Sequence, residues 1–224
     1  MIVIRFFDIT FSLLSLICLL PLLLPIVLIL KFSGEGEIFY LQQRIGLTGN
    51  SFNLIKFATM LKNSSNMKLG TITIKNDPRI LKIGVFLRNT KINELPQLLN
   101  VLKGDMSLIG PRPLTSMAFK AYSTDIQNLL ITSKPGLSGL GSIFFREEEK
   151  ILSLVDDPKK FHHTVIASHK GELEKWYVNN SSIYLYFCLI LLTVIVVFFP
   201  KTNLLNKFFK DIPLPPDELK KYLK

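Results

Sequence analysis

The chain has 224 residues, of which 48% are hydrophobic, and its formal net charge at pH 7 is +10. That length allows one hydrophobic core with residues to spare for membrane elements, and the positive charge indicates an anionic partner: nucleic acid, anionic lipid or a phosphorylated small molecule. The two cysteines, Cys18 and Cys188, both lie in apolar runs, which argues against a disulfide framework and favours a reducing compartment.

The first predicted element is an apolar segment over residues 6–32, long enough to cross a bilayer as a helix. A cleaved signal peptide is disfavoured, because the run is too long and no small-residue cleavage site follows it. Pro21 and Pro25 lie in its middle, where each removes a helix hydrogen bond and can kink the helix. Arg5 and Lys31 flank both ends, so the positive-inside rule selects no orientation. Two forms stay open: a bent helix that enters and leaves on one face, and a single kinked transmembrane helix.

Residues 33–182 have the composition of an ordinary folded domain. Hydrophobic patterning predicts short strands and helices there, with Thr115 or Ser116 capping a long helix and three glycines making a loop over 136–141. The expected strands are 38–41, 52–56 and 71–75, the segment 80–87 is a strand or a short helix, and the expected helices are 115–133, 147–154 and 163–177.

A second apolar run, residues 183–199, carries no charge. It is at the short end of what a helix needs to cross a bilayer, roughly 17–25 residues. Crossing, lying in the interface and docking on the first segment therefore all stay open. The tail beyond it, which mixes Phe208 and Phe209 with several lysines, suits an interfacial helix.

Residues 93–113 are the most informative stretch, because two acids, two cations, two glycines and three prolines punctuate short apolar runs. Such a composition suits a rigid loop better than a plain helix or strand. Basic side chains beside turns accompany it, and the fork of an arginine matches a phosphate bidentately. With the carboxylates of Glu94 and Asp105, which suit Mg²⁺, these side chains predict a phosphate-plus-metal site. The basic residues are Arg44, Lys56, Arg79, Arg88, Arg112 and Arg146.

Two other kinds of site are disfavoured. A nucleic-acid-binding protein would also be basic, but no binding module is recognisable and the membrane segment does not suit one. His162, His163 and His169 have no acid or cysteine at a spacing that completes a metal site, so a metal centre there is disfavoured.

The stretch 93–113 resembles the bacterial sugar transferase family of membrane phosphoglycosyl transferases. The most specific part is Leu-Lys-Gly-Asp-Met-Ser-Leu-Ile-Gly-Pro-Arg-Pro, which begins at Leu102. Supporting pieces follow the family's order over roughly residues 1–190. They are Arg5 with Asp8, and the segments 42–46, 56–60, 77–79, 86–88, 134–139 and 176–181.

The resemblance implies an α+β monotopic membrane protein of the bacterial inner membrane. It implies a re-entrant membrane helix over 1–32, a phosphoglycosyl transferase domain on the cytoplasmic face over 33–182, and a membrane-associated segment and tail over 183–224. In the family the membrane helix breaks at a Ser-Pro pair. Here the pair is Leu24-Pro25, so Pro25 is the expected kink while the serine hydroxyl is missing.

The resemblance also implies a reaction, the transfer of a sugar 1-phosphate from a UDP-sugar to polyprenyl phosphate with release of UMP. That reaction is the first membrane step of polysaccharide, O-antigen, capsule or glycoprotein glycan synthesis. Membrane lipids are a further implied partner, and a homodimer or a partner transferase is left open. By resemblance, Asn93 and Glu94 form the catalytic pair, Glu94 and Asp105 bind Mg²⁺, and the substrate phosphates contact Lys56, Arg79, Arg88, Arg112 and Arg146.

Residue 93 is the main departure from the family, whose members carry a nucleophilic aspartate there and form an aspartyl-phosphosugar intermediate. An amide oxygen is a far weaker nucleophile than a carboxylate. Three interpretations follow: an active transferase in which Glu94, another carboxylate or the acceptor phosphate attacks; a binding-only relative that assists a partner transferase; and a related phosphoryl transfer on another substrate. Ala58 and residues 140–145 depart as well, while Arg146 is kept. The departures lie around the expected uridine or sugar, so the sequence does not identify the sugar.

Overall fold

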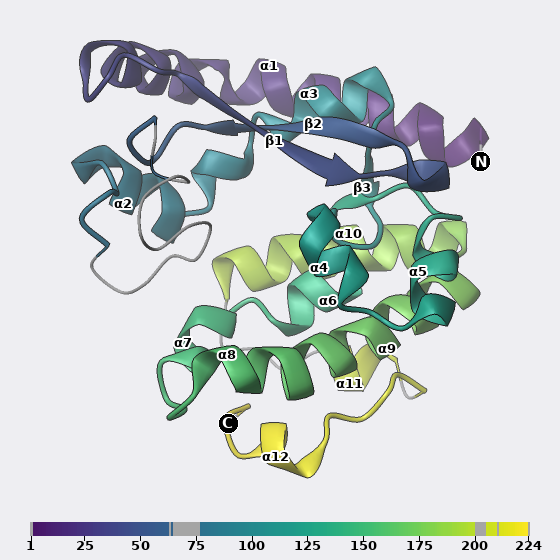
Figure 1. Cartoon of the computed structure of the whole chain (residues 1–224). Coiled ribbons are helices and arrows are strands. Elements are labelled where there is room, and N and C mark those ends of the chain that lie inside the picture. The colour runs from purple at the N-terminus through teal and green to yellow at the C-terminus, as the bar shows by residue number, and fades with distance from the viewer. Residues whose placement is uncertain (1, 63, 65–76, 200–204, 210, 224) are drawn as a thin grey trace. The chain divides into compact units, whose positions relative to one another are not determined.

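The computed structural model describes residues 2–62, 64, 77–199, 205–209 and 211–223 (Figure 1). Helices predominate, and the described strands form two two-stranded sheets, which confirms the α+β class. The α-helices are α1 (Ile2–Phe32), α2 (Lys82–Asn89), α3 (Gln97–Lys103), α4 (Ser116–Lys120), α5 (Thr124–Leu130), α6 (Leu140–Phe144), α7 (Glu148–Leu152), α8 (Pro158–Phe161), α9 (Ala167–Asn179), α10 (Ile183–Phe198), α11 (Leu205–Phe208) and α12 (Asp217–Lys220). The strands are β1 (Phe39–Ile45), β2 (Ser51–Phe57), β3 (Ser107–Ile109) and β4 (Gly136–Ser138). Single turns of other helix types are the 3₁₀ segments η1 (Leu47–Gly49) and η3 (Ile92–Glu94) and the π segment η4 (His162–Ile166).

The chain divides into two compact units. The anchor unit comprises Phe7–Gln43 and Asn53–Lys103. The C-terminal unit comprises Met1–Phe6, Arg44–Phe52 and Gly104–Lys224. Strands β1 and β2 pair with each other, and the chain passes from one unit to the other within each of these strands.

Helix α1 is one uninterrupted helix of 31 residues that continues through both of its internal prolines. It is the only helix of the described chain that is long and apolar enough to cross a membrane, and most of its side chains are exposed. In the anchor unit Ile26 and Leu30 pack with Phe57 and Leu87 in a small core. Asp8 and Ser12 near its other end are buried as well, but most of the remaining side chains of α1 are exposed and apolar, which suits a lipid environment. The kink at Pro25 and the re-entrant path stay predictions.

The rest of the anchor unit is built on strand β2 and the segment that follows it. Phe57 stacks on Phe39 of β1, with ring centroids 5.7 Å apart. Helix α2 lies directly on the backbone of Thr59, because a Cβ added at Gly84 would be 2.2 Å from the Thr59 carbonyl oxygen. The same carbonyl accepts a hydrogen bond of 3.0 Å from the Leu81 N–H at the start of α2. These contacts fix where α2 begins and which way it faces.

The C-terminal unit is centred on α9, which packs against α5 and α6. Leu173 and Ile166 are completely buried there. Gly171 allows the close approach of α5, since a Cβ at that position would lie 2.9 Å from atoms of both Tyr122 and Ile126. The short sheet of the unit is parallel, with Ser107 opposite Gly136 and Ile109 opposite Ser138.

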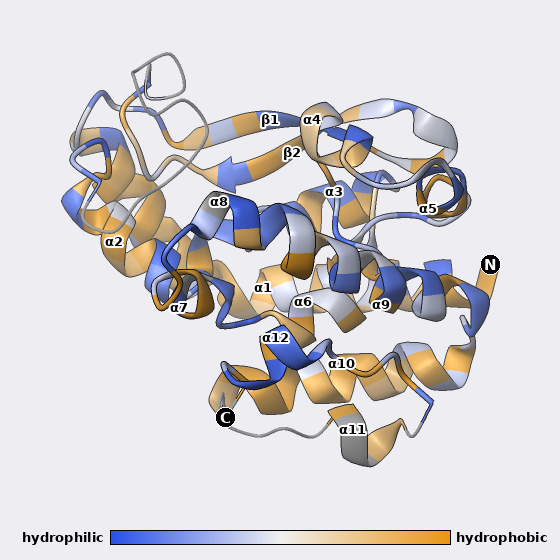
Figure 2. Ribbon diagram, turned by 60° about the horizontal axis from the view of Figure 1, so that its bottom comes forward, coloured by the Kyte–Doolittle hydropathy of each residue, from blue (hydrophilic) through white to orange (hydrophobic). Residues whose placement is uncertain are grey.

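Helix α10 has one face inside the C-terminal unit and one face outside it. The inner face, which includes the buried Leu189 and Leu192, packs on α6 and the β3–β4 sheet, and Thr193 forms a 2.8 Å hydrogen bond with Ser138. The outer face is also apolar, and Figure 2 shows hydrophobic colour along the whole helix. Because one side is committed to protein, this packing favours a helix docked on its own unit with its outer face available to lipid.

The tail packs on the C-terminal unit, where the sequence predicted an interfacial helix. Ile212 and Leu219 are buried, and the Tyr222 ring meets Phe161 of α8 edge-on at 5.6 Å. Phe209 contacts Trp176 of α9, with ring centroids 5.8 Å apart. The described tail is thus globular at these positions, since its apolar side chains are covered by protein.

Several predicted elements are confirmed, and three predictions are wrong. The structure contains strands β1 and β2 and helices α7, α9 and α10, and the 80–87 segment is helix α2. The predicted 71–75 strand lies outside the described residues. The stretch 93–113 is not one rigid loop, because α3 begins directly after Pro96, where proline is tolerated, and β3 follows. The predicted 115–133 helix is two helices, and the predicted 136–141 loop contains β4 and the start of α6. Thr115 does cap the first of the two helices, accepting the Ala118 N–H at 3.2 Å.

Candidate functional site

Asn93 and Glu94 lie in the tight turn η3 of the anchor unit. The turn follows Lys91, whose φ of 61° is in the left-handed region, so the chain reverses sharply after α2. Asn93 is buried, and its side-chain oxygen has no hydrogen-bond partner in the described part of the chain. A buried polar atom without a partner is costly in free energy, and it marks a place where a ligand or an ordered water can bind.

Glu94 is held by Lys56 of strand β2. The Lys56 Nζ atom donates to the Glu94 Oε1 atom at 3.1 Å, and both side chains are largely shielded from solvent. Asn100 of α3 fixes β2 beside them: its side-chain oxygen accepts the Ile55 N–H at 3.0 Å and its amide nitrogen donates to the Asn53 carbonyl at 2.8 Å. One cation and one carboxylate are therefore positioned together within this unit.

Arg79 is buried and committed to protein partners. Its Nε and Nη2 atoms donate to the two carboxylate oxygens of Asp77 at 2.9 and 2.6 Å, and its Nη1 atom donates to the Ser64 carbonyl at 2.6 Å. Contact of Arg79 with a phosphate stays a prediction, and in this geometry the guanidinium braces the chain around Asp77. Sequence reasoning did not single out Asp77, although an acid two residues before an arginine was a visible signal.

Arg88 has a different environment from Arg79. It is half-buried at the end of α2, and its Nη1 atom lies 3.9 Å from the Met60 sulfur, a weak acceptor. None of the described carboxylates forms an ion pair with it at 4.0 Å or less. Within the anchor unit, Arg88 is thus the predicted phosphate contact with the least committed guanidinium.

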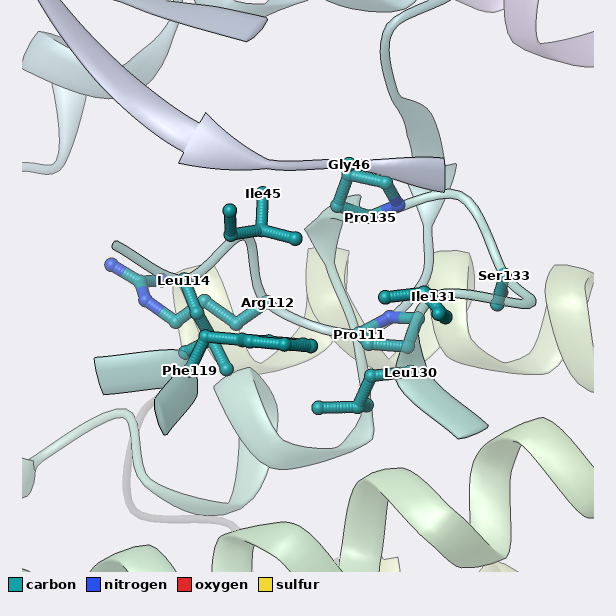
Figure 3. Close-up of a pocket in the computed structure, with 10 residues that line it drawn as sticks. All are labelled: Ile45, Gly46, Pro111, Arg112, Leu114, Phe119, Leu130, Ile131, Ser133 and Pro135. Carbon is teal, nitrogen blue, oxygen red and sulfur yellow. The ribbon is translucent and has the colours of Figure 1, made fainter. Parts of the chain in front are cut away.

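The C-terminal unit contributes the loop that carries Arg112. Figure 3 shows Pro111 and Arg112 at the edge of a small pocket whose other walls include Leu114, Phe119 and Ile131. Apart from Arg112 and Ser133, the side chains that line the pocket are apolar. Arg44 supports the loop from the β1 side, donating from Nη1 to the Pro113 carbonyl at 3.1 Å. The structure therefore gives Arg44 a supporting position behind the loop.

Helix α9 supports the same loop with two side chains that sequence reasoning missed. Glu174 accepts the Arg112 backbone N–H at 3.3 Å, and the Tyr177 hydroxyl donates to the Ile109 carbonyl at 3.2 Å. Burial, opposed by the Arg112 hydrogen bond and by the charges of Lys170 and Arg112, raises the pKa of Glu174 to about 7. No sequence pattern distinguished this glutamate from the exposed acids of the same helix.

A second charged network surrounds Glu148 at the end of the unit. Lys170 donates to it at 2.7 Å and His162 lies 3.2 Å from its other oxygen. Burial alone would raise the pKa of Glu148, but the hydrogen bonds and charges of His162 and Lys170 prevail and lower it to about 2. His169 lies against the rings of Phe144 and Phe145, and burial lowers its pKa to about 4. His169 is therefore a buried, neutral histidine packed on aromatic rings.

The predicted site residues are divided between the two units. Asn93, Glu94, Lys56, Arg79 and Arg88 belong to the anchor unit, and Asp105, Arg112 and Arg146 belong to the C-terminal unit. In the anchor unit the structure pairs Glu94 with Lys56, and Arg79 with Asp77. Arg146 is half-buried just after α6, and Asp105 is half-buried just before β3.

The anchor unit offers few ligands for a metal ion. Among the described residues, no group of three or more histidine, cysteine, aspartate or glutamate side chains could hold one. Mg²⁺ commonly binds through one or two carboxylates together with substrate phosphates and waters. Glu94, next to the unpartnered side-chain oxygen of Asn93, fits an ion of that kind when a diphosphate supplies further oxygens.

Comparisons with known proteins agree on one family. The family model described as bacterial sugar transferase matches residues 1–200. The "Uncharacterized sugar transferase EpsL" of Bacillus subtilis is 36% identical over 194 residues, covering 87% of this chain and 86% of that protein. The "Exopolysaccharide production protein ExoY" of Sinorhizobium fredii is 36% identical over 158 residues, 64% of this chain and 70% of that protein. The "Undecaprenyl-phosphate galactose phosphotransferase" of Salmonella typhimurium is 35% identical over 190 residues, which cover 79% of this chain but only 36% of that longer protein.

Proposed function

The chain belongs to the bacterial sugar transferase family, and from that premise we propose that it transfers a sugar 1-phosphate from a UDP-sugar to polyprenyl phosphate. The observation that carries the proposal is the match over residues 1–200, together with relatives whose names specify undecaprenyl-phosphate sugar phosphotransfer. The paired Lys56 and Glu94 and the less committed Arg88 support it, since phosphoryl transfer depends mainly on positioning and charge stabilisation.

The reaction balances without a further reactant. An oxygen of the acceptor phosphate forms a bond to the β-phosphorus of the UDP-sugar, the bond from that phosphorus to the bridging oxygen breaks, and UMP leaves with the electron pair. In this proposal Lys56 and Arg88 offset charge on the phosphates. We propose Mg²⁺ on the diphosphate with Glu94 as a protein ligand, where the ion would neutralise phosphate charge; the same role for Asp105 stays a prediction.

Direct attack by the acceptor phosphate is the mechanism that we favour for this chain. Asn93 presents a neutral amide, which is a weak nucleophile. Glu94 is already engaged by Lys56, so attack through its oxygen would sacrifice that ion pair. Asp77, the other carboxylate beside a predicted phosphate contact, is buried and bound on both oxygens by Arg79. The acceptor brings its own phosphate oxygen and needs no protein nucleophile.

The neutral amide of Asn93 also supports a second candidate function. In that case the chain binds a nucleotide sugar or a lipid phosphate without turnover and assists a partner transferase. The unpartnered oxygen of Asn93 is compatible with such a binding role, because it lies in a buried turn beside a charged pair.

For the location we propose the inner face of the bacterial cytoplasmic membrane, with α1 re-entrant. The apolar and mostly exposed surface of α1 supports membrane insertion, and Arg5 and Lys31 at its two ends suit a helix that keeps both ends on one face. The apolar outer face of α10 is a second surface that supports membrane association.

The test is an assay of the purified full chain with a panel of UDP-sugars, polyprenyl phosphate and Mg²⁺, scored by UMP release. Wild type is compared with Asn93→Asp and Glu94→Gln. UMP release by wild type that Glu94→Gln abolishes supports the transferase. Silence of wild type with turnover by Asn93→Asp supports the binding-only alternative, and silence of both overturns transfer to this acceptor.

A further inference from the structure

The segment that carries Arg112 is held by α9 at two points of its backbone. Glu174 accepts the Arg112 N–H at 3.3 Å, and Tyr177, three residues further along the same helix, donates to the Ile109 carbonyl at 3.2 Å. Residues three apart on a helix share a face, so one face of α9 is hydrogen-bonded to both ends of the segment 109–112. Glu174 and Tyr177 are themselves buried, which leaves them little freedom to move.

On its other side the segment is backed by protein backbone. A Cβ at Gly110 would lie 2.4 Å from the Lys134 carbonyl oxygen, and one at Gly139 would lie 2.1 Å from the Gly110 carbonyl oxygen. The Gly110 N–H donates to the Ser138 carbonyl at 3.0 Å, and the Gly136 N–H donates to the Pro111 carbonyl at 2.8 Å. The backbone behind the segment and α9 beside it leave little room for the segment to move, so they hold the backbone from which the Arg112 side chain extends.

Glu174 has no comparable alternative partner. Its Oε2 atom is buried without a hydrogen bond, and Gly141 of α6 lies against Oε1, where an added Cβ would be only 2.6 Å away. Lys170, one turn earlier on α9, is bound to Glu148 of α7 instead. The other titratable group that faces Glu174 is Tyr122, between α4 and α5, whose pKa burial and the Glu174 charge both raise. The Arg112 amide is thus the contact that this carboxyl group makes.

We propose that Glu174 is a positioning residue that fixes the backbone of Arg112, and through it the direction of the Arg112 guanidinium toward the donor's phosphates. The second half of this statement rests on the proposed function. Figure 3 shows the Arg112 side chain extending away from Pro111 and Pro135, so a small rotation at its amide displaces the guanidinium by a larger distance.

The titration of Glu174 adds a signature that a purely structural residue would lack. Its pKa of about 7 means that the carboxyl group gains negative charge between pH 6 and pH 8. A negative charge next to Arg112 weakens the attraction of that arginine for a phosphate. Donor affinity therefore falls as the pH rises through this range. Protonation of the ligand changes the affinity of wild type and variants equally. The difference between their pH dependences of affinity therefore reports on Glu174 alone.

Two variants separate the hydrogen bond from the charge, and a third is the control. Glu174→Gln keeps an acceptor oxygen but cannot ionise, Glu174→Leu loses both, and Glu172→Gln changes an exposed acid on the same helix. The readouts are hydrogen exchange of the peptide that contains the Arg112 amide, and KM and kcat for the UDP-sugar at pH 6 and pH 8, on the full chain in lipid nanodiscs.

The proposal expects faster exchange at Arg112 and a KM raised about tenfold in Glu174→Leu, the size of one hydrogen bond to a charged group. At pH 6, hydrogen exchange and KM of Glu174→Gln should equal those of wild type. Between pH 6 and pH 8, the factor by which KM rises should be about threefold smaller in Glu174→Gln than in wild type. Glu172→Gln should match wild type throughout.

Wild-type exchange at Arg112 in a folded Glu174→Leu protein overturns the proposal, as does an undiminished pH effect in Glu174→Gln. If wild type releases no UMP at all, the proposed function fails on its own account. In that event the exchange readout and the binding of UDP by calorimetry at the two pH values still decide the role of Glu174.

Discussion

Lys56 Nζ and Glu94 Oε1 lie 3.1 Å apart although 38 residues separate them in the chain. The contact joins strand β2 to the turn η3, and α3 supports it from behind through Asn100. The Lys56 ammonium group fixes the orientation of the Glu94 carboxylate. The pair therefore places one positive and one negative group ready for a phosphate and a metal ion.

Lys56→Met should reduce UMP release about tenfold or more, because a hydrogen bond between charged groups is worth roughly 1.5–3 kcal/mol. Lys62→Met is the matched control, since Lys62 belongs to the same unit and pairs with Glu37 at the exposed surface. Equal losses in the two variants would show that general charge, and not the Glu94 contact, matters.

Arg79→Ala and Arg88→Ala should separate a structural arginine from a ligand-binding one. Arg79→Ala strands the buried Asp77 carboxylate, so we expect a loss of about 3–5 kcal/mol in the free energy of unfolding. Arg88→Ala breaks only a weak contact with Met60, so its melting temperature should stay near that of wild type while UDP binding weakens. Thermal unfolding and calorimetry with UDP measure the two effects. A stable Arg79→Ala protein would contradict the bracing role.

Glu174 should make the free energy of unfolding depend on pH. Its pKa in the folded chain, about 7, is above the ordinary glutamate value of 4.5, so the folded state binds the proton more tightly than the unfolded state. The resulting stabilisation is complete below pH 4.5 and is lost as the pH rises through 7, a total of about 3 kcal/mol. Glu174→Gln should flatten this part of the curve in thermal unfolding between pH 5 and pH 8. A wild-type slope in the variant would show that other groups cause it.

Gly110→Ala should destabilise the C-terminal unit by about 1–3 kcal/mol or more, because the new Cβ would meet rigid backbone at the Lys134 carbonyl and force strands β3 and β4 apart. Gly46→Ala is the comparison, since its Cβ would meet the Phe52 ring at 3.1 Å, which can rotate aside, and the Asn50 carbonyl oxygen only at 3.3 Å. Melting temperatures of the two variants give the result. Equal effects would show that the backbone contact carries no special constraint.

The sequence predicted those parts of the fold that depend on local pattern. Hydrophobic runs and turn residues located α1, α10, the β1–β2 hairpin and the cap at Thr115. It failed where distant backbone decides the outcome. Gly136 and Gly139 predicted a loop, but they lie in strand β4 and at the start of α6. Glycine is needed at both positions because a Cβ would collide with Gly110. The prolines near α3 misled in the same way, since Pro96 precedes that helix instead of breaking it.

The candidate site was predictable as a set of residue types and not as a set of contacts. Glu94 and Lys56 were expected near phosphate, and the structure joins them. Arg79 was placed in the same group, but its donors are bound by Asp77 and Ser64. Glu174 was not anticipated, because its special character comes from burial and from the Arg112 amide, neither of which a single helix sequence reveals.

Gly110 contacts Gly136 and Gly139 backbone to backbone, so no side chain lies at this contact that a substitution could change. Under the proposed function, a change of donor sugar therefore cannot arise by substitution at these three glycines, because an added Cβ would meet backbone and separate the two strands. Such a change would have to come from neighbouring side chains such as Phe119, which lines the pocket beside Arg112.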